Sequence, residues 1–408
     1  MNLNSPILFI EINKLEFIFG VGELDESSGF KLLYNQTTPI EGIVDNKIIE
    51  LERISEILKS CIYSIEQKLN LNFKNIILVL DNFDKFCISL TGFKKLNGSQ
   101  LLKENISYII NSLKSNLSEI ENKKSVIHIF NSKYSLDNKN IENLPVGLFG
   151  DFYTHELSFF LINTNDYKNL KTIFDKCNLR IKKIISKNFI DGINIISNLK
   201  TETFIKIEIN RDDIELIYFE NSAIKYFQNF KFGANLILKD ISKIVALNVE
   251  TVENILISSK TLEKSNKSDF IEKEFFDNKN YRKIKKELIF DIAKARIEEI
   301  SEIVLLKNIN LKSFLKKNAT ILLKINDLLS MKCFKDFYES SFSKKDEFQI
   351  KFLENINKNK TFESVHKLVQ YGWKKEAVPI VQEKKSLISR LFTLVFDWYL
   401  LFLETLVV

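Results

Sequence analysis

Residues 7–21, ILFIEINKLEFIFGV, contain two short apolar runs separated by a polar turn. The runs at 7–12 and 17–21 have the length and the β-branched and aromatic content of strands. Asn13 and Lys14 lie between them, so the stretch predicts a β-hairpin. The same signal returns in the middle of the chain, where residues 203–209 and 214–219 predict a second hairpin.

Alternating helix and strand signals follow each hairpin. After the first, apolar spacing predicts helices at 51–69, 100–117 and 166–178 and strands at 76–80, 125–130 and 157–162. After the second, it predicts strands at 224–230 and 319–324, helices at 235–246, 250–259, 288–304 and 362–371, and a polar loop at 265–280. A hairpin-led α/β unit therefore occurs twice, separated by about 195 residues.

Two similar α/β lobes with a cleft between them form the actin-like plan. The predicted fold class is therefore a two-lobe, duplicated ribonuclease-H-like α/β fold with an inserted subdomain in each lobe. A C-terminal amphipathic helix is predicted to follow the second lobe.

The segment 386–408 is apolar except for a few polar residues, and its only charges are Arg390, Asp397 and Glu404. They are seven residues apart, so on an α-helix they drift by only about 20° per step and share one stripe. A helix with a thin polar edge and a wide apolar face suits a membrane interface. The predicted lipid contacts are Leu391, Phe392, Val395, Phe396, Trp398 and Phe402.

Two other interpretations of this segment stay open. At about 1.5 Å per residue it is long enough to span a bilayer, although a charge near the bilayer centre costs roughly 2.5–3.5 kcal/mol. It could also be a core or dimer helix. Residues 374–385 resemble a linker, and Lys374, Lys375, Lys384 and Lys385 could attract anionic lipid headgroups.

Composition excludes several classes. The net charge of +6 is spread along the chain, which argues against nucleic-acid binding. Four cysteines lie far apart without a CxxC pair, which fits a reducing cytoplasm and predicts neither disulfides nor a zinc site. The three histidines form no cluster. The N-terminus has no basic region and no long apolar run, so no signal peptide is expected.

Several stretches, in order along the chain, resemble the bacterial cell-division protein FtsA family. Residues 145–150 (PVGLFG) resemble a segment of the subdomain inserted into that family's first lobe. Residues 126–130 and 134–137 resemble the strand and turn ahead of it. Residues 292–300 resemble the long helix of the second lobe's outer subdomain, and 232–235 with 240–241 resemble its beginning. The C-terminal amphipathic helix completes the pattern.

This resemblance implies an ATP site with magnesium, held by two hairpins that each begin Asp-x-Gly. Here both aspartates are replaced by glutamate and both glycines are absent. One interpretation is a degenerate site that binds nucleotide weakly or not at all. The other is a divergent site in which Lys14 and Arg211 supply charge that the backbone no longer provides. Neither favours hydrolysis. The residues at the corresponding positions are Glu11, Asn13, Lys14, Glu208, Asn210, Arg211, Gly233 and Asn326.

The resemblance also implies a partner site, in which the outer subdomain receives the C-terminal peptide of FtsZ. Lys294, Arg296 and Glu299 are the predicted contacts, led by Arg296, which could pair with an acidic peptide. The alternative is that Arg296 pairs with Glu299 within its own helix.

The expected segments are a first lobe and its insertion, a second lobe and its insertion, and a tail. Their ranges are 1–80, 81–160 (inserted), 161–198, 199–232, 233–317 (inserted, partner-binding), 318–373, 374–385 (linker) and 386–408 (membrane helix).

The expected function is to tether FtsZ filaments to the cytoplasmic face of the inner membrane at the division site. The expected partners are FtsZ, further copies of this chain, other division proteins and anionic lipids. A type IV pilus assembly adaptor and an actin-fold ATPase or kinase remain as alternatives.

Overall fold

The computed structural model describes residues 6–25, 29–81, 83–258, 270–276, 281–315, 318–343, 347–354 and 358–377. The predicted amphipathic helix at 386–408, with its six lipid-contact residues, lies outside these ranges. Within the ranges, no helix combines the length and the apolar character that crossing a membrane requires.

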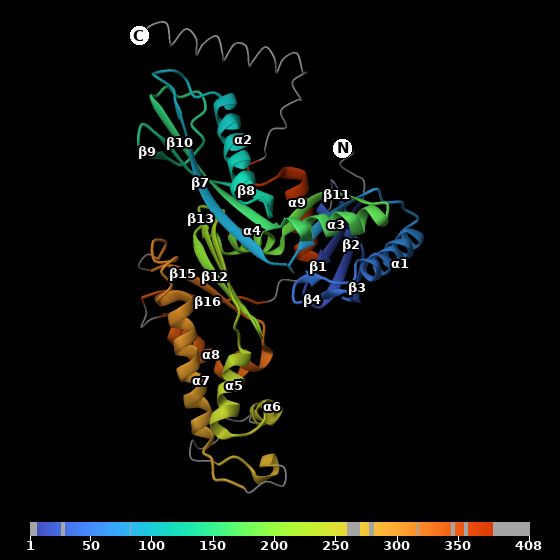
Figure 1. Ribbon diagram of the computed structural model, residues 1–408, viewed down its shortest axis with the longest axis vertical. Helices are drawn as coiled ribbons and strands as arrows, with labels where there is room; N and C mark the ends of the chain where they lie inside the picture. The colour runs from blue at the N-terminus through green and yellow to red at the C-terminus, as the bar shows by residue number, and fades with distance from the viewer. Residues whose placement is uncertain are drawn as a thin grey trace.

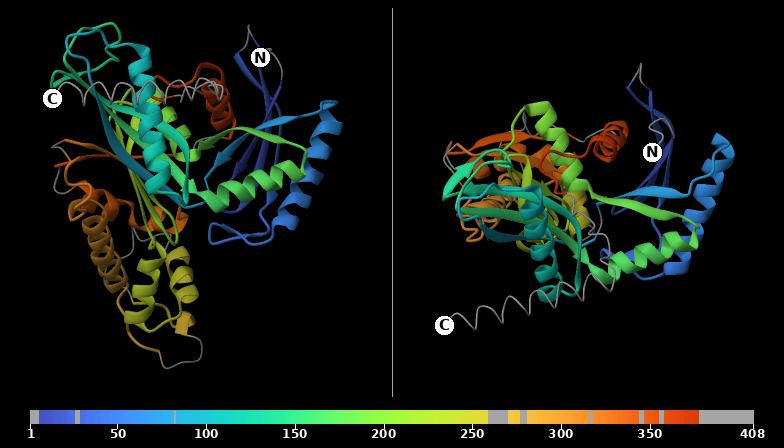
Figure 2. Two further views of the ribbon diagram at one scale, coloured as in Figure 1. Left: turned by 45° about the horizontal axis from the view of Figure 1, so that its top comes forward. Right: turned by 90° about the horizontal axis from the view of Figure 1, so that it is seen from above.

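The N-terminal hairpin lies within a five-stranded sheet. β1 pairs antiparallel with β2 and parallel with β6. Helices α1 (Leu51–Leu69) and α3 (Thr164–Lys176) cover one face of the sheet, as Figure 2 shows, and bury their apolar stripes against it. The strands, in sheet order, are β11 (Arg180–Ser186), β6 (Asn75–Leu80), β1 (Ile7–Ile12), β2 (Glu16–Asp25) and β3 (Gly29–Pro39).

A separate antiparallel sheet is inserted between β6 and α3, and we call residues 85–163 the inserted subdomain. Helix α2 (Lys103–Ile120) packs Ile106, Ile109 and Leu113 into its core. In Figure 1 this subdomain lies at the top of the molecule. Its strands, in sheet order, are β7 (Lys85–Lys95), β10 (Phe152–Asn163), β8 (Lys124–Leu136) and β9 (Lys139–Ile141).

The second half repeats the first: β12 pairs antiparallel with β13 and parallel with β15. The strands, in sheet order, are β14 (Ala223–Phe230), β13 (Ile214–Glu220), β12 (Phe204–Ile209), β15 (Thr320–Ile325) and β16 (Gln349–Phe352). Helix α8 (Leu328–Ser343) packs near β15 and β16. We call residues 235–306 the outer subdomain, at the bottom of Figure 1. Its helices are α5 (Asn235–Val245), α6 (Val249–Ser258) and α7 (Lys286–Ser301), which continues into a π-helical segment, Glu302–Leu306.

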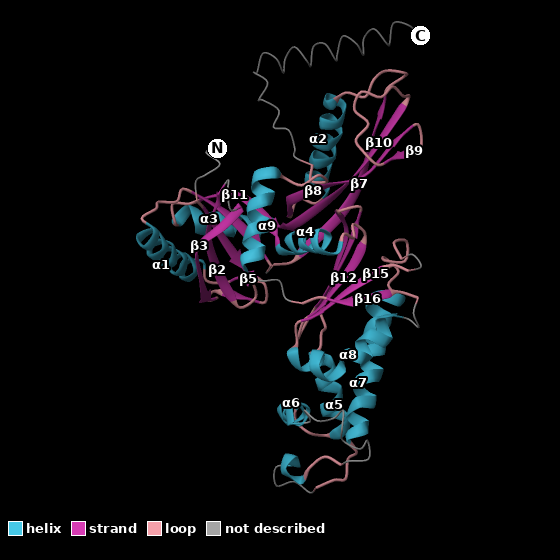
Figure 3. Ribbon diagram, turned by 180° about the vertical axis from the view of Figure 1, so that it is seen from behind, coloured by secondary structure: helices cyan, strands magenta, loops and turns pink. Residues whose placement is uncertain are grey.

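Helices α4 (Lys187–Leu199) and α9 (Lys358–Tyr371) pack between the two large sheets, as Figure 3 shows from behind. Phe189 and Phe362 share a buried cluster with Phe9 of the first sheet and Phe219 of the second. A Cβ at Gly192 would lie 2.0 Å from the Phe219 ring, so only glycine allows α4 to approach the second sheet this closely. The two large sheets therefore share the buried cluster that lies between them.

Both predicted hairpins and the predicted alternation of helices and strands after each hairpin are confirmed. The sequence patterns did not predict β3, β4 (Ile43–Val44), β5 (Lys47–Ile48), β7, β9, β11, α4, α8 or β16. Helix α4 was missed because Gly192 and the asparagines and isoleucines around it are weak helix formers, although Lys187, Asp191 and Asn194 recur at helical spacing. Of the predicted loop at 265–280, the described part contains a short 3₁₀ turn, Lys273–Phe276.

Candidate functional site

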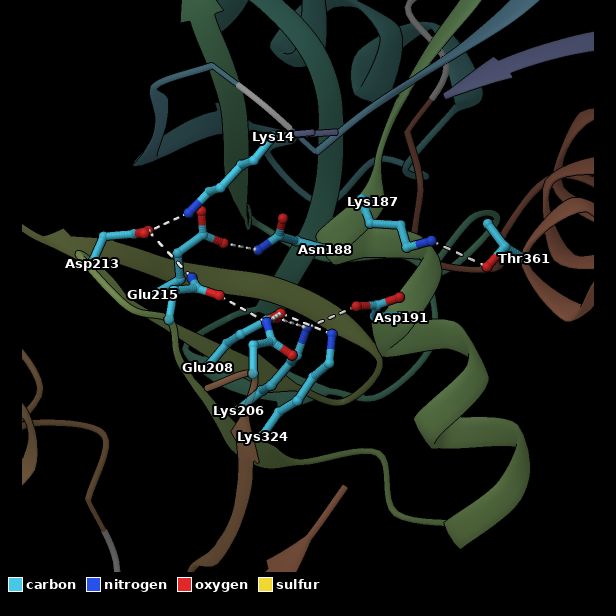
Figure 4. A network of polar contacts seen from close by, with 12 residues as sticks. Lys14, Lys187, Asn188, Asp191, Lys206, Glu208, Asp213, Glu215, Lys324 and Thr361 are labelled. Carbon is cyan, nitrogen blue, oxygen red and sulfur yellow. Dashed lines mark hydrogen bonds and ion pairs between the residues drawn. The ribbon is translucent and has the colours of Figure 1, made fainter. Parts of the chain in front are cut away.

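The β1–β2 turn and the β12–β13 turn meet where the two sheets face each other. Lys14 of the first turn forms an ion pair with Asp213 of the second, as Figure 4 shows. Beside this pair lies a cavity of about 270 Å³. Among its lining residues are five of the predicted nucleotide-site residues: Asn13, Lys14, Glu208, Asn210 and Asn326. Leu15, Asp81 and Glu215 complete the lining.

Backbone donors of the first turn are already used within the chain. The Oδ1 atom of Asn13 accepts hydrogen bonds from the backbone N–H groups of Leu15 and Glu16, both at 2.7 Å. Asparagine commonly caps a turn in this way. A phosphate cradle needs backbone N–H groups that point at the ligand, so the Asn13 side chain occupies the role that a phosphate oxygen would take.

The second turn supports the outer subdomain. The N–H of Ala234 donates to the Asn210 carbonyl at 2.9 Å, and a Cβ at Gly233 would lie 2.3 Å from that same oxygen. Glycine at position 233 therefore permits a close approach of two backbone segments. Arg211 turns away from the cavity and pairs with Glu253 on α6.

Buried lysines fill the space beneath the turns. Lys206 of β12 is fully buried, with its Nζ atom 2.8 Å from Asp191 Oδ2 and 2.7 Å from Glu208 Oε2. The other oxygen of Glu208 lies 2.8 Å from Lys324 Nζ and accepts a hydrogen bond from Asn326 Nδ2 at 2.7 Å. Glu208 is therefore surrounded by donors from its own chain (Figure 4).

Two further lysines pair with the remaining carboxylates. Lys187 at the start of α4 lies 3.1 Å from Glu11 Oε2 and donates to Thr361 Oγ1 at 3.1 Å. Lys85 at the start of β7 lies 3.0 Å from Glu215 Oε1, and Asn188 Nδ2 donates to Glu215 Oε2 at 2.7 Å. Glu11 lies within this cluster, outside the lining of the cavity.

Burial and ion pairing set the charges of the cluster. Burial lowers the pKa of Lys206, but Asp191 and Glu208 outweigh burial, so the pKa is raised. Burial raises the pKa of Glu208, but Lys206 and Lys324 hold that pKa well below its ordinary value. For Asp81, burial outweighs the attraction of Lys85, and the pKa is raised. Lys206 and Glu208 therefore persist as a charged pair, whereas Asp81 is shifted toward its neutral form.

A nucleotide with its magnesium ion does not fit these residues. The N–H groups of Leu15 and Glu16 are occupied, and Lys14 is paired with Asp213. Glu11, Glu208 and Glu215 are neutralised by lysines at the positions where a metal ion would have to compensate them. The described ranges contain no group of three or more His, Cys, Asp or Glu side chains suited to a metal. The geometry favours the degenerate-site alternative.

Two hairpin-led sheets, crossover helices between them and a subdomain inserted in each half define an actin-like protein. In agreement, the fold is similar to a solved structure of a PilM-PilN type IV pilus biogenesis complex, with a TM-score of 0.54, 8% identity, and 88% of this chain and 90% of that chain covered. No protein-family model matches the chain.

Within this class, the chain is a divergent FtsA-like protein. It is 21% identical over 408 residues to Cell division protein FtsA of Buchnera aphidicola subsp. Acyrthosiphon pisum (strain APS), covering 96% of this chain and 97% of the relative. It is 17% identical over 302 residues to Cell division protein FtsA of Neisseria meningitidis serogroup B (strain ATCC BAA-335 / MC58), covering 73% and 72%. The resemblance noted in the sequence is thereby confirmed.

The predicted partner residues lie on α7 of the outer subdomain. Arg296 pairs with Asp240 on α5 and with Glu299 on its own helix, as the intramolecular alternative expected. Lys294 is exposed, as is Glu299. The Arg296 guanidinium is therefore already held by two carboxylates of its own subdomain.

The chain segment after α9 is fixed to the body, and we call residues 373–377 the strap. His128 accepts the Ser186 N–H on Nε2 at 3.0 Å, so its Nδ1 carries the proton and donates to Glu376 Oε1 at 2.8 Å. Glu376 also lies 2.9 Å from Lys183, and the N–H of Ala377 donates to the Ile129 carbonyl at 2.7 Å. The strap thus extends the inserted sheet along β8.

The predicted linker consequently begins later than residue 374. Lys374, which was predicted to attract lipid headgroups, forms an exposed ion pair with Glu202. Lys375 lies over the Tyr134 ring at 5.3 Å, with its backbone oxygen bonded to the Asn131 N–H. Although its composition is typical of a linker, the start of this stretch pairs with β8, which is distant in the sequence.

Protonation of Glu376 is expected to release the strap. Burial favours the neutral acid, but His128 and Lys183 lower the pKa of Glu376 from 4.5 to about 2. Because the folded-state pKa is the lower one, the stabilisation is present above about pH 4.5 and is lost as the pH falls toward about 2. At 1.36 kcal/mol per unit, this corresponds to about 3 kcal/mol.

The measurement is urea unfolding of the natural protein and of Glu376→Gln at about pH 6 and about pH 3. At about pH 6 the natural protein should have a higher free energy of unfolding than Glu376→Gln. At about pH 3 the difference in free energy of unfolding between the two proteins should be smaller. A gap that is independent of pH would show that the Glu376 charge does not hold the strap.

The lysines that neutralise the site were not predicted from the sequence. One signal was present: Lys206 and Glu208 alternate with isoleucines in β12, so they share the face opposite those isoleucines. Lys187 and Asp191 are four residues apart and so lie on one face of α4. Lys85 and Glu215 carried no such signal, because 130 residues separate them.

Proposed function

We propose that this chain is a non-hydrolysing cell-division scaffold that tethers FtsZ filaments to the cytoplasmic face of the inner membrane at the division site. The observation that carries the proposal is the similarity to FtsA along nearly the whole of both chains. The lysine-filled site supports a scaffold over an ATPase, because its ion pairs occupy the positions where phosphates and metal would be held.

The eight expected segments are part of this proposal, with the outer segment 233–317 as the FtsZ-binding part and 386–408 as the membrane helix. One tail helix binds anionic lipid reversibly. Self-association of the body brings several tails together, and avidity makes attachment firm without any new contact. Other division proteins would join the same assembly.

Pilus assembly is not favoured by any observation of this chain. Its likeness to the PilM-PilN complex, at 8% identity, supports the shared fold alone. Similarity in sequence extends instead to proteins of cell division.

Binding of an FtsZ C-terminal peptide tests the proposal. Full-length protein on vesicles should bind the peptide, and Arg296→Glu should weaken binding about tenfold, or about 1.4 kcal/mol, because a guanidinium–carboxylate pair becomes a repulsion. Lys243→Glu, an exposed charge reversal on α5 of the same subdomain, is the matched control and should bind normally.

Absence of peptide binding by the natural protein would contradict the FtsZ-tethering function. Equal weakening by Arg296→Glu and Lys243→Glu would leave tethering intact but place the contact elsewhere. Melting temperatures of both variants would confirm that the outer subdomain remains folded.

A further inference from the structure

A continuous series of ion pairs joins the two large sheets through α4. Glu11 on β1 of the first sheet pairs with Lys187 at the start of α4. One turn further along the helix, Asp191 pairs with Lys206 on β12 of the second sheet. Lys187 also bonds Thr361 on α9, the other helix between the sheets. Each link lies in the buried or partly buried interior, where salt screens charges least.

The inserted subdomain adds a second connection. Although it branches from the first half of the chain, β7 and β8 pack against β14 of the second sheet. Lys85 of β7 reaches Glu215 of β13, with Nζ also 3.0 Å from Asn188 Oδ1 on α4. Nearby, Lys225 of β14 lies 2.7 Å from Glu156 of β10.

The strap makes a third connection. Trp373 donates its indole N–H to the Ser222 carbonyl in the turn between β13 and β14, at 2.8 Å. Three residues later, Glu376 contacts His128 of the inserted subdomain and Lys183 of β11. A five-residue segment therefore touches both large sheets and the inserted sheet.

We infer that internal lysines take the place of a nucleotide and its metal, so that this chain holds its two lobes in one fixed relation without any ligand. Lys206 and Lys85 form ion pairs between the two halves, and Lys187 links Glu11 of the first half to Thr361 of the second. The direct Lys14–Asp213 ion pair then closes the opening between the two turns.

The charge balance of the cluster supports this inference. Lys85, Lys187, Lys206 and Lys324 face Glu11, Asp191, Glu208 and Glu215. A buried charged carboxylate needs a nearby cation, and each of these four has a lysine from its own chain, whereas Asp81 is shifted toward its neutral form. A triphosphate would bring further negative charge to a cluster that is already balanced. Assembly of this chain is therefore expected to follow concentration and membrane binding and not nucleotide state.

Hydrogen exchange of the full-length protein on vesicles tests the inference, with and without millimolar Mg·ATP. The peptides to follow cover the two turns, residues 11–20 and 208–216. We expect Mg·ATP to leave their exchange unchanged. Lys187→Met should raise exchange in both turns on the order of tenfold, because Glu11 is left unpaired and the lobes separate more often. Glu11→Gln with Lys187→Met should restore most of the protection.

Arg53→Met is the matched control, because Arg53 forms an exposed ion pair with Glu41 within the first half and should leave both turns unchanged. Protection of either turn by Mg·ATP in the natural protein would overturn the inference. The inference would also be overturned if both turns exchanged at the same rates in Lys187→Met as in the natural protein. If Lys187→Met fails to fold, Lys14→Ala is the variant to measure. Removal of the partly exposed Lys14–Asp213 ion pair should raise hydrogen exchange in the two turns alone. Unchanged exchange in Lys14→Ala would contradict the inference that this pair closes the opening between the turns.

The inference is independent of FtsZ and of the partner site on α7, neither of which enters the exchange test. Failure of peptide binding would leave the inference about the fixed lobes unaffected. Conversely, protection of the turns by nucleotide would overturn that inference while leaving the proposed tethering intact.

Discussion

Replacing Lys206 with methionine is expected to lower the free energy of unfolding by about 3–5 kcal/mol. Methionine preserves most of the side-chain volume, so little of this loss comes from a cavity. The loss arises because Asp191 and Glu208 both lie within 2.8 Å of the Lys206 ammonium and would remain buried without it. Unfolding in urea, followed by circular dichroism, measures the change.

Two comparisons sharpen this test. Arg53→Met removes an exposed ion pair and should cost less than about 1 kcal/mol. Lys206→Met combined with Asp191→Asn should lose less stability than Lys206→Met alone, because one of the unpaired charges is gone. A loss for Lys206→Met as small as that for Arg53→Met would show that the cluster contributes little to holding the sheets together.

Replacing Phe392 and Phe396 with aspartate is expected to release the protein from anionic vesicles. Each buried phenylalanine contributes about 1.5–3 kcal/mol to burial of the apolar face, and each aspartate adds a charge that resists leaving water. The combined effect exceeds roughly a hundredfold in partitioning, at 1.4 kcal/mol per tenfold. Co-sedimentation of full-length protein with vesicles measures the loss.

The matched control carries the same two new charges on the polar stripe. Ser386→Asp with Thr393→Asp should still sediment with vesicles, because these positions lie beside Arg390 and Asp397 on the predicted helix. Equal loss from both double variants would indicate electrostatic repulsion in place of a buried apolar face. Unchanged sedimentation of the phenylalanine variant would place membrane binding elsewhere.

Much of the architecture could be predicted from local patterns. Residues 7–21 and 203–219 carry alternating apolar runs around polar turns, and both form hairpins in the structure. Helix α1 was equally clear, because Ile54, Leu58, Ile62 and Ile65 recur at helical spacing and are buried. Helix α4 was not, because Gly192 and the asparagines and isoleucines around it are weak helix formers.

The candidate site could be predicted from the sequence only in part. Substitution of the hairpin glycines indicated a degenerate site, and Asn13 was recognised as a turn residue. Its side chain, however, also takes the backbone N–H groups of Leu15 and Glu16. The outward direction of Arg211, toward Glu253, depends on where α6 packs and could not be known beforehand.

By itself, the sequence determined the repeated hairpin-led α/β units, the loss of the phosphate-binding glycines and the amphipathic pattern of the last residues. These features depend on neighbours within a few positions, where backbone preference and apolar periodicity act. Only the tertiary structure decided that lysines neutralise the site and that residues 373–377 join β8. Glu11 and Lys187 are 176 residues apart, and Lys85 and Glu215 are 130 residues apart. Such pairs form only once the two sheets pack around α4.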